Sequence, residues 1–316
     1  MSSKLLSVKS SWPPLRRAII SYACLAVSYI ILIFALPPNH IDMHMYNLSS
    51  DSYHILLFAI TVPSILIWFV GFYSYAQLQC YVRSLAGSPE EQDFKRLANG
   101  VRWLVWSLPV SALVNIILNS IANTHIGFYS AAIIISNYVA LILPLIGFSL
   151  ISSAAHGLLS RAQTRLTLSS ARFIILVFVV LGVLYCYFTF RHFNLSSFGS
   201  LDNPYHLPVW LMVLTVAIPY LYAWFVGLLA SYELMHFSNQ VTGVLYRQAL
   251  RLLAGGTIAV VISSIGSQYS SSVSPHVGYF VLNHRLLFSY LFRVIAGAGY
   301  VLIAFGVSRL HRIEAI

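Results

Sequence analysis

An internal repeat constrains the architecture of this chain more than any other feature. Residues 63–111 align without a gap onto residues 219–267, at a constant offset of 156, and 14 of the 49 aligned positions are identical. The identities include a Trp-Phe-Val-Gly block at 68–71 and again at 224–227. A second pair of matched blocks, 125–129 and 276–280, continues the similarity at an offset of 151. Self-similarity of this kind indicates a duplicated structural unit.

Composition identifies the class of protein. The hydrophobic fraction is 59%, the mean hydropathy is +0.79 and charged residues make up 8% of the 316 residues, whereas an average soluble domain has about 25% charged residues. Stretches long enough to cross about 30 Å of hydrocarbon occur near 17–36, 54–78, 102–122, 127–153, 172–190, 208–234, 252–268 and 280–308. The sequence therefore predicts an all-α polytopic membrane protein with eight transmembrane helices.

Four of these spans fall in each half of the chain. Because four is an even number, each half begins and ends on the same side, and the two copies enter the membrane in the same orientation. We therefore expect two tandem parallel four-helix repeats, 17–163 and 164–308, related by a pseudo-twofold axis along the membrane normal, with a cytoplasmic N-terminal segment 1–16 and a cytoplasmic tail 309–316. Parallel repeats occur in transporters, with the substrate site between the repeats, but duplication also produces inert bundles.

The basic residues predict the orientation. With the N-terminus inside, the cytoplasmic segments hold 15 of the 18 Lys and Arg residues, and only Arg191, Arg285 and Arg293 lie elsewhere. The positive-inside rule then places both termini in the cytoplasm, as expected for a multi-pass protein of the cell membrane. The net charge of +10 is explained by this topology and by anionic lipid headgroups, so no nucleic-acid partner is needed.

Polar groups inside the spans are the candidate binding residues, because a charge near the bilayer centre costs at least about 2.5–3.5 kcal/mol. Arg285, Ser289 and Arg293 are spaced i, i+4, i+8 and form one polar stripe on the last span. Glu233, whose repeat mate is Gln77, is the only carboxylate within a span. Asn115 and Asn119 add a polar face to the third span.

Two interpretations of the polar stripe remain open. In the structural one, Arg293 is held by backbone carbonyls, Asn side chains or lipid phosphate and orders the bundle. In the functional one, Arg285 and Arg293 line a cavity that opens outward and bind a carboxylate or a lipid phosphate. A direct pair between Arg293 and Glu233 is not expected, because the two residues lie about half a membrane apart along their helices.

Histidines near the outer ends of the spans are the candidate metal or haem ligands. They are His54, His125, His206 and His276, together with His40 and His44 in the first outer loop. Their spacing matches no established zinc, copper or haem motif, and His is common at membrane interfaces. We therefore expect no metal and no cofactor.

The sequence does not indicate an enzyme. It contains no His-Glu-x-x-His, no Gly-x-x-x-x-Gly-Lys-Ser/Thr and no Gly-x-Ser-x-Gly motif. The functional hypothesis is a secondary transporter, or a protein that handles lipid or an anionic solute at a site between the repeats, with membrane lipids as partners. The alternative is a non-catalytic structural or assembly subunit that docks other membrane chains.

The topology is testable by cysteine-accessibility labelling. We expect single cysteines placed in 40–50 and 192–206 to react with an impermeant reagent from outside, and those in 85–96 and 238–247 to react only from inside, because of the basic asymmetry. If the two loops of either pair react from opposite sides of the membrane, the eight-span arrangement is wrong.

Overall fold

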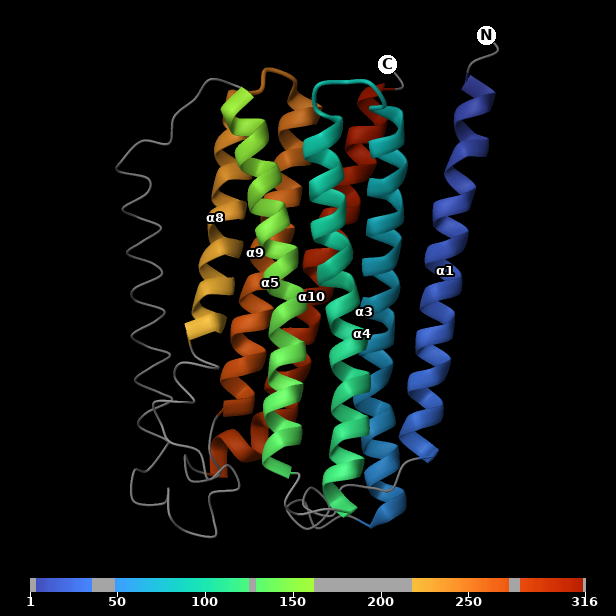
Figure 1. The fold of residues 1–316 in the computed structure, drawn as a ribbon, viewed down its shortest axis with the longest axis vertical. Coiled ribbons are helices and arrows are strands. Elements are labelled where there is room, and N and C mark those ends of the chain that lie inside the picture. The colour runs from blue at the N-terminus through green and yellow to red at the C-terminus, as the bar shows by residue number, and fades with distance from the viewer. Residues whose placement is uncertain (1–3, 36–48, 125–128, 162–217, 273–278, 315–316) are drawn as a thin grey trace.

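The computed structural model describes residues 4–35, 49–124, 129–161, 218–272 and 279–314, and every regular element in these ranges is an α-helix. The helices are α1 (Lys4–Ala35), α3 (Ser50–Ser84), α4 (Glu91–Thr124), α5 (Tyr129–Arg161), α8 (Ile218–Gln240), α9 (Val244–Ser272) and α10 (Tyr279–Glu314). Their axes are roughly aligned, and the start of α1 and the end of α10 lie at the same end of the bundle (Figure 1).

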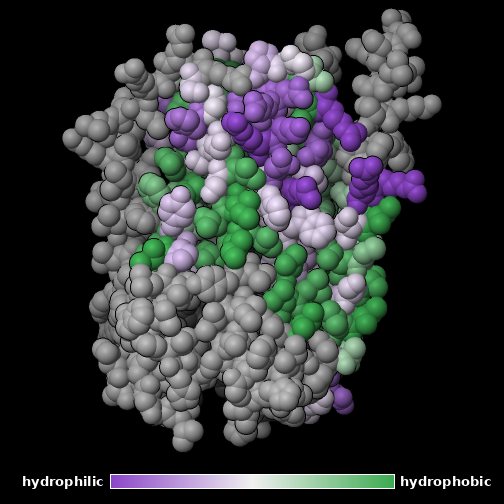
Figure 2. Space-filling view, in the orientation of Figure 1, coloured by the Kyte–Doolittle hydropathy of each residue, from purple (hydrophilic) through white to green (hydrophobic). Residues whose placement is uncertain are grey.

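Six of these helices are long and apolar enough to cross a membrane. The qualifying segments are Arg16–Ala35, Thr61–Ser84, Glu91–Val114, Ala140–Ser160, Val244–Gly266 and Leu291–His311. Hydrophilic residues gather toward the end of the bundle that carries the termini, and hydrophobic residues form a band next to them (Figure 2). These features indicate an integral membrane protein that crosses the bilayer several times, as composition predicts.

Six of the eight predicted spans coincide in part with these segments, and α8 covers the sixth predicted span from Ile218 onward. The fifth, 172–190, lies outside the described residues, so the number eight stays a prediction. Helices also begin earlier than the apolar stretches do: α4 begins at Glu91 rather than near 102, and α9 at Val244 rather than near 252. Hydropathy marks the hydrocarbon boundary, whereas backbone hydrogen bonding continues beyond it.

The cytoplasmic N-terminal segment 1–16 stays a prediction, and from Lys4 onward this segment is helical, because α1 begins there. The connections at this end are correspondingly short, with residues 85–90 between α3 and α4 and residues 241–243 between α8 and α9. Gly87, at φ 83°, occupies a backbone conformation in the first turn that other residues rarely adopt. Its N–H donates to Glu91 Oε2 at 2.8 Å.

The described helices form a closed ring around a shared core. Going round the ring, α3 packs on α4, α4 on α5, α5 on α8, α8 on α9, α9 on α10 and α10 on α3. Helix α1 stands outside this ring, mainly against α3 (Figure 1). A single cluster of buried apolar side chains includes members from all seven helices. In the described part of the chain the two halves therefore share one core, and their main helix-to-helix contacts are α5 with α8 and α10 with α3.

Glycines bring helix backbones into close contact in each half. A Cβ atom on Gly100 of α4 would lie 2.8 Å from the carbonyl oxygen of Gly147 in α5, and one on Gly256 of α9 would lie 2.6 Å from that of Gly299 in α10. Small residues that let backbones approach are a main source of packing energy between helices in lipid. These contacts make α4–α5 and α9–α10 tightly packed hairpins.

Adjacent glycines of α9 offer a matched test of this packing. We expect Gly256→Ala to destabilise the protein by about 1–3 kcal/mol, because the added methyl group meets the Gly299 backbone. Gly255→Ala should be neutral or stabilising, since its nearest atom lies 3.9 Å away and alanine favours helices by up to about 1 kcal/mol over glycine. Thermal unfolding in detergent measures both, and equal effects of the two changes would contradict the close contact.

Candidate functional site

The candidate site is built around Glu233, whose side chain is buried between the two halves of the chain. Glu233 lies in α8 and is only 3% exposed. Its Oε1 atom is 3.4 Å from Nδ1 of His156, and its Oε2 atom is 3.4 Å from the hydroxyl oxygen of Ser152. Both partners are on α5, so this buried carboxylate links α8 to α5.

Helix geometry explains why Ser152 and His156 act together. They are spaced i and i+4 on α5, which places them on one face of that helix, one turn apart. Their surroundings differ, however, because the His156 side chain is 69% exposed whereas that of Glu233 is 4% exposed. The contact therefore joins a carboxylate inside the bundle to an imidazole at its outer surface.

Chemically, this arrangement can transfer a proton. A buried carboxylate is more easily kept neutral than charged, and an imidazole can give or take a proton near physiological pH. The distances of 3.4 Å are longer than a good hydrogen bond, so the contact is loose and a small helix shift could make or break it.

Two further carboxylates lie at the same end of the bundle. Glu90 Oε2 accepts a hydrogen bond of 3.2 Å from the Tyr246 hydroxyl of α9. Asp93 is 2% exposed, packs its carboxylate against Gly157 of α5, and lies 3.5 Å from the guanidinium of Arg96. Sequence reasoning missed both carboxylates, because they precede the apolar stretch of α4. Asp93 lies one helical turn before Leu97, so extending the helical pattern of α4 back by one turn places Asp93 on the same face as Leu97.

The other contact between the halves, α10 with α3, has its own polar bonds. His311 Nε2 lies 3.0 Å from the backbone oxygen of Gln77, and the Ser74 hydroxyl donates to the backbone oxygen of Tyr300 at 2.9 Å. Gln77 is the repeat mate of Glu233. Each of these two helix contacts, α5 with α8 and α10 with α3, therefore has a histidine beside the same repeat position, but only the first has a carboxylate there.

Arg293 lies where α1, α3 and α10 meet. It is close enough to interact electrostatically with Tyr29 of α1, whose hydroxyl is hydrogen-bonded to the Thr61 side chain of α3. One turn further along α10, Gly297 faces Ile67 of α3. Glu233, in contrast, contacts α5, so the structure places these two predicted site residues at different helix contacts.

For the remaining predicted binding residues, the structure shows only the helix to which each belongs. Arg285 and Ser289 belong to α10, and Asn115 and Asn119 belong to α4. Their side chains lie outside the described part of the structure. Their inclusion in a site stays a prediction.

Of the candidate metal ligands, only His54 is described. Its ring stacks on Phe34, with centroids 5.9 Å apart, and its Nδ1 atom lies 2.9 Å from the backbone oxygen of Ile33. The other candidates, His40, His44, His125, His206 and His276, fall outside the described residues. Within the described ranges, no three His, Cys, Asp or Glu side chains come together in a way that could hold a metal ion.

Comparison with known proteins adds no assignment: the chain matches no protein family, no curated protein and no solved structure.

The strength of the Glu233–His156 contact can be measured with a double-mutant cycle. We expect Glu233→Gln and His156→Gln to show a coupling energy of about 1 kcal/mol or less, because His156 is mostly exposed and such pairs are weak. The coupling energy should decrease at high salt, because salt ions screen the attraction between the two charged groups. Thermal unfolding of the two single variants and the double variant gives the value, and strictly additive effects at low salt would show that the two groups do not interact.

Proposed function

We propose that the chain is a secondary transporter that couples proton movement at Glu233 and His156 to movement of an anionic solute or lipid between two four-helix repeats. The observation that carries this proposal is the buried Glu233 carboxylate at the contact between the halves, next to an exposed imidazole. An ionisable group inside a membrane bundle is costly, and it most often marks a pathway for ions or substrate.

The proposed repeats are supported by equivalent packing in the two halves. The Gly100–Gly147 contact has a counterpart in Gly256–Gly299, and Gly71 meets Val105 just as Gly227 meets Val261. Neighbouring helices also correspond, since α3, α4 and α5 follow one another round the ring as α8, α9 and α10 do. The first helix of the second repeat is expected at 172–190, outside the described residues.

The Glu90–Tyr246 hydrogen bond supports the proposed twofold axis directly. These residues are repeat mates: they occupy aligned positions, 156 residues apart in the sequence. A residue can touch its own mate only if both lie close to the axis that relates the repeats. The proposed axis therefore passes between the connections at 85–90 and 241–243, along the direction of the helices.

In this mechanism the two halves rock against each other about their contacts, α5 with α8 and α10 with α3. When α5 and α8 approach, the proton on the His156 imidazolium passes to the Glu233 carboxylate, which leaves both groups neutral. When they separate, the buried Glu233 carboxyl releases its proton to the other side. Arg293, where α10 meets α3, supplies the positive charge for the anionic group.

The test is transport by the full chain reconstituted in liposomes. A pH step should drive uptake of a carboxylate from a panel of mono- and dicarboxylates, recorded as current on a supported membrane. Glu233→Gln should reduce the pH-driven current at least ten-fold, because glutamine cannot carry the proton. Gln77→Leu, the same position in the other repeat, should leave the current within two-fold. Equal currents from the Glu233→Gln variant and the unchanged protein would refute the coupling role.

The second candidate function is a non-catalytic assembly subunit, and helix α1 favours it. Only 17% of its apolar span is buried, and Val27, Ile31 and Phe34 are each more than half exposed. Arg293→Gln separates the two functions. Loss of transport with unchanged expression and melting temperature supports the transporter, whereas loss of folded protein or of a co-purifying membrane chain supports the assembly subunit.

A further inference from the structure

A hydrogen bond between repeat mates joins the two halves of the chain at one end of the proposed twofold axis. The Tyr246 hydroxyl donates to Glu90 Oε2 at 3.2 Å. Glu90 ends the connection between α3 and α4, and Tyr246 lies in the first turn of α9. Both connections, 85–90 and 241–243, lie at the end of the bundle that carries the start of α1 and the end of α10 (Figure 1). The bond therefore spans the axis where the halves meet at this end.

Aromatic rings from both halves pack around this bond. Tyr81 of α3 packs edge-on against Phe94 of α4, with ring centroids 5.1 Å apart, and Phe237 of α8 packs edge-on against Tyr246 at 6.3 Å. Tyr81 and Phe237 are repeat mates, so each half contributes a ring from the same position. Tyr81, Phe94 and Phe237 are buried, and Tyr81 is close enough to Tyr246 to interact electrostatically with it. In this structure side chains thus fill this end of the axis.

Each partner of the bond is fixed to its own half. The backbone oxygen of Glu90 accepts from the N–H of Phe94 at 3.0 Å, which ties Glu90 to the first turn of α4. The Arg247 guanidinium, next to Tyr246, donates to the backbone oxygen of Val241 from Nε at 3.1 Å and from Nη2 at 2.9 Å. These bonds hold the two connections in shape. A shift of α4 or α9 therefore moves Glu90 or Tyr246 with it.

Symmetry determines what a rocking motion does to this bond. Mates lie on opposite sides of the axis that relates the halves, so a symmetric movement displaces them in opposite directions. The separation of Glu90 and Tyr246 then changes by the sum of the two displacements. Because O–H···O bonds prefer about 2.5–3.0 Å and this one measures 3.2 Å, a small separation of the halves at this end breaks it.

We propose that the Glu90–Tyr246 hydrogen bond is a latch that holds this end of the axis closed, and that it breaks when the Glu233–His156 contact opens to this side. This inference rests on the proposed rocking transport, for which it provides the closure at one end. With the latch closed, the packed rings of Tyr81 and Phe237 exclude water from this end. With the latch broken the two rings move apart, since they belong to different halves.

Spin-label distances in the full chain test the latch without any transport measurement. Ala86→Cys and Thr242→Cys place nitroxide labels on exposed repeat mates in the two connections, once the three native cysteines are replaced by serine. Tyr246→Phe keeps the ring and removes the donor. We expect it to raise the ratio of the long-distance to the short-distance population about five-fold, the change expected for the loss of one hydrogen bond.

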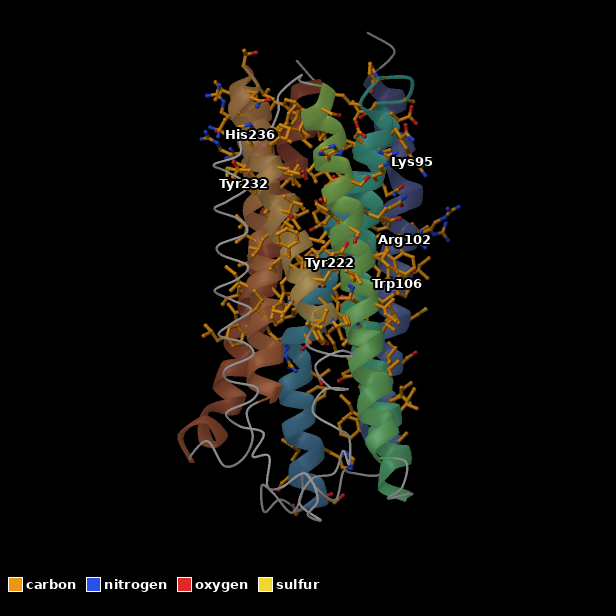
Figure 3. The ribbon with its side chains drawn as sticks, turned by 60° about the vertical axis from the view of Figure 1, so that its left-hand side comes forward. Lys95, Arg102, Trp106, Tyr222, Tyr232 and His236 are labelled. Carbon is orange, nitrogen blue, oxygen red and sulfur yellow. The ribbon has the colours of Figure 1, made fainter. Side chains whose placement is uncertain are left out.

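The matched control is Tyr232→Phe, which also removes one tyrosine hydroxyl from the second half. Tyr232 stacks on His236 of the same helix, with ring centroids 6.1 Å apart, and Figure 3 shows both side chains on α8. This change should leave the distance ratio within two-fold. An unchanged ratio in Tyr246→Phe, or equal shifts in the two variants, overturns the latch.

Locking the latch connects it to transport. Glu90→Cys/Tyr246→Cys, joined by a short bis-methanethiosulfonate reagent, should reduce the pH-driven current in liposomes at least ten-fold, and dithiothreitol should restore it. The same reagent on Gln77→Cys/His311→Cys, at the α10–α3 contact, should leave the current within two-fold. Current that persists in the locked protein overturns the latch and leaves the transport proposal standing. If the unlocked protein gives no current, the transport proposal fails, and the spin-label distances still decide the latch.

Discussion

Close approach of helix backbones through glycine is the constraint on which the rest of this bundle depends. Inside lipid there is no hydrophobic force between helices, because acyl chains are as apolar as leucine. Packing therefore has to come from contact, and Gly100 with Gly147 and Gly256 with Gly299 provide it. The contacts join α4 to α5 and α9 to α10 as tight pairs. These pairs then meet α8 and α3 through larger side chains.

That difference in packing explains where a polar group can function. A side chain at the points where Gly100 meets Gly147 and Gly256 meets Gly299 would separate the two backbones, so polar side chains lie elsewhere. Glu233 and Ser74 lie on α8 and α3, facing α5 and α10 across the contacts between the halves. There the helices are separated by side chains, and space exists for a carboxylate, an imidazole or a hydroxyl group. The contact that holds Glu233 is thus also one about which the halves could move.

The sequence predicts the class of fold and one residue of the candidate site, Glu233. The physical reason is different in the two cases. Long apolar stretches predicted the helices well, because the hydrocarbon thickness requires them. Hydropathy could not predict where α4 begins, since helical hydrogen bonding continues past the membrane boundary, and Asp93 was missed for that reason. Glu233 was recognised as a carboxylate within a span. Its partner His156 was not, because only the packing of α5 on α8 brings the two together. The orientation, the number of spans and the roles of Arg285, Ser289, Asn115 and Asn119 stay predictions.

Differences between the halves carry more functional information than their similarities. The matched glycine contacts support one scaffold used twice, and such a scaffold is needed whether or not the protein transports anything. Glu233 aligns with Gln77 in the repeat. A carboxylate inside a membrane bundle carries a desolvation cost that glutamine avoids. A residue kept at that cost in one half only is therefore explained better by a specific ligand than by packing. By this reasoning, the proton that we propose at Glu233 is a departure from the symmetric frame, and Glu233 can be replaced without disturbing the glycine contacts.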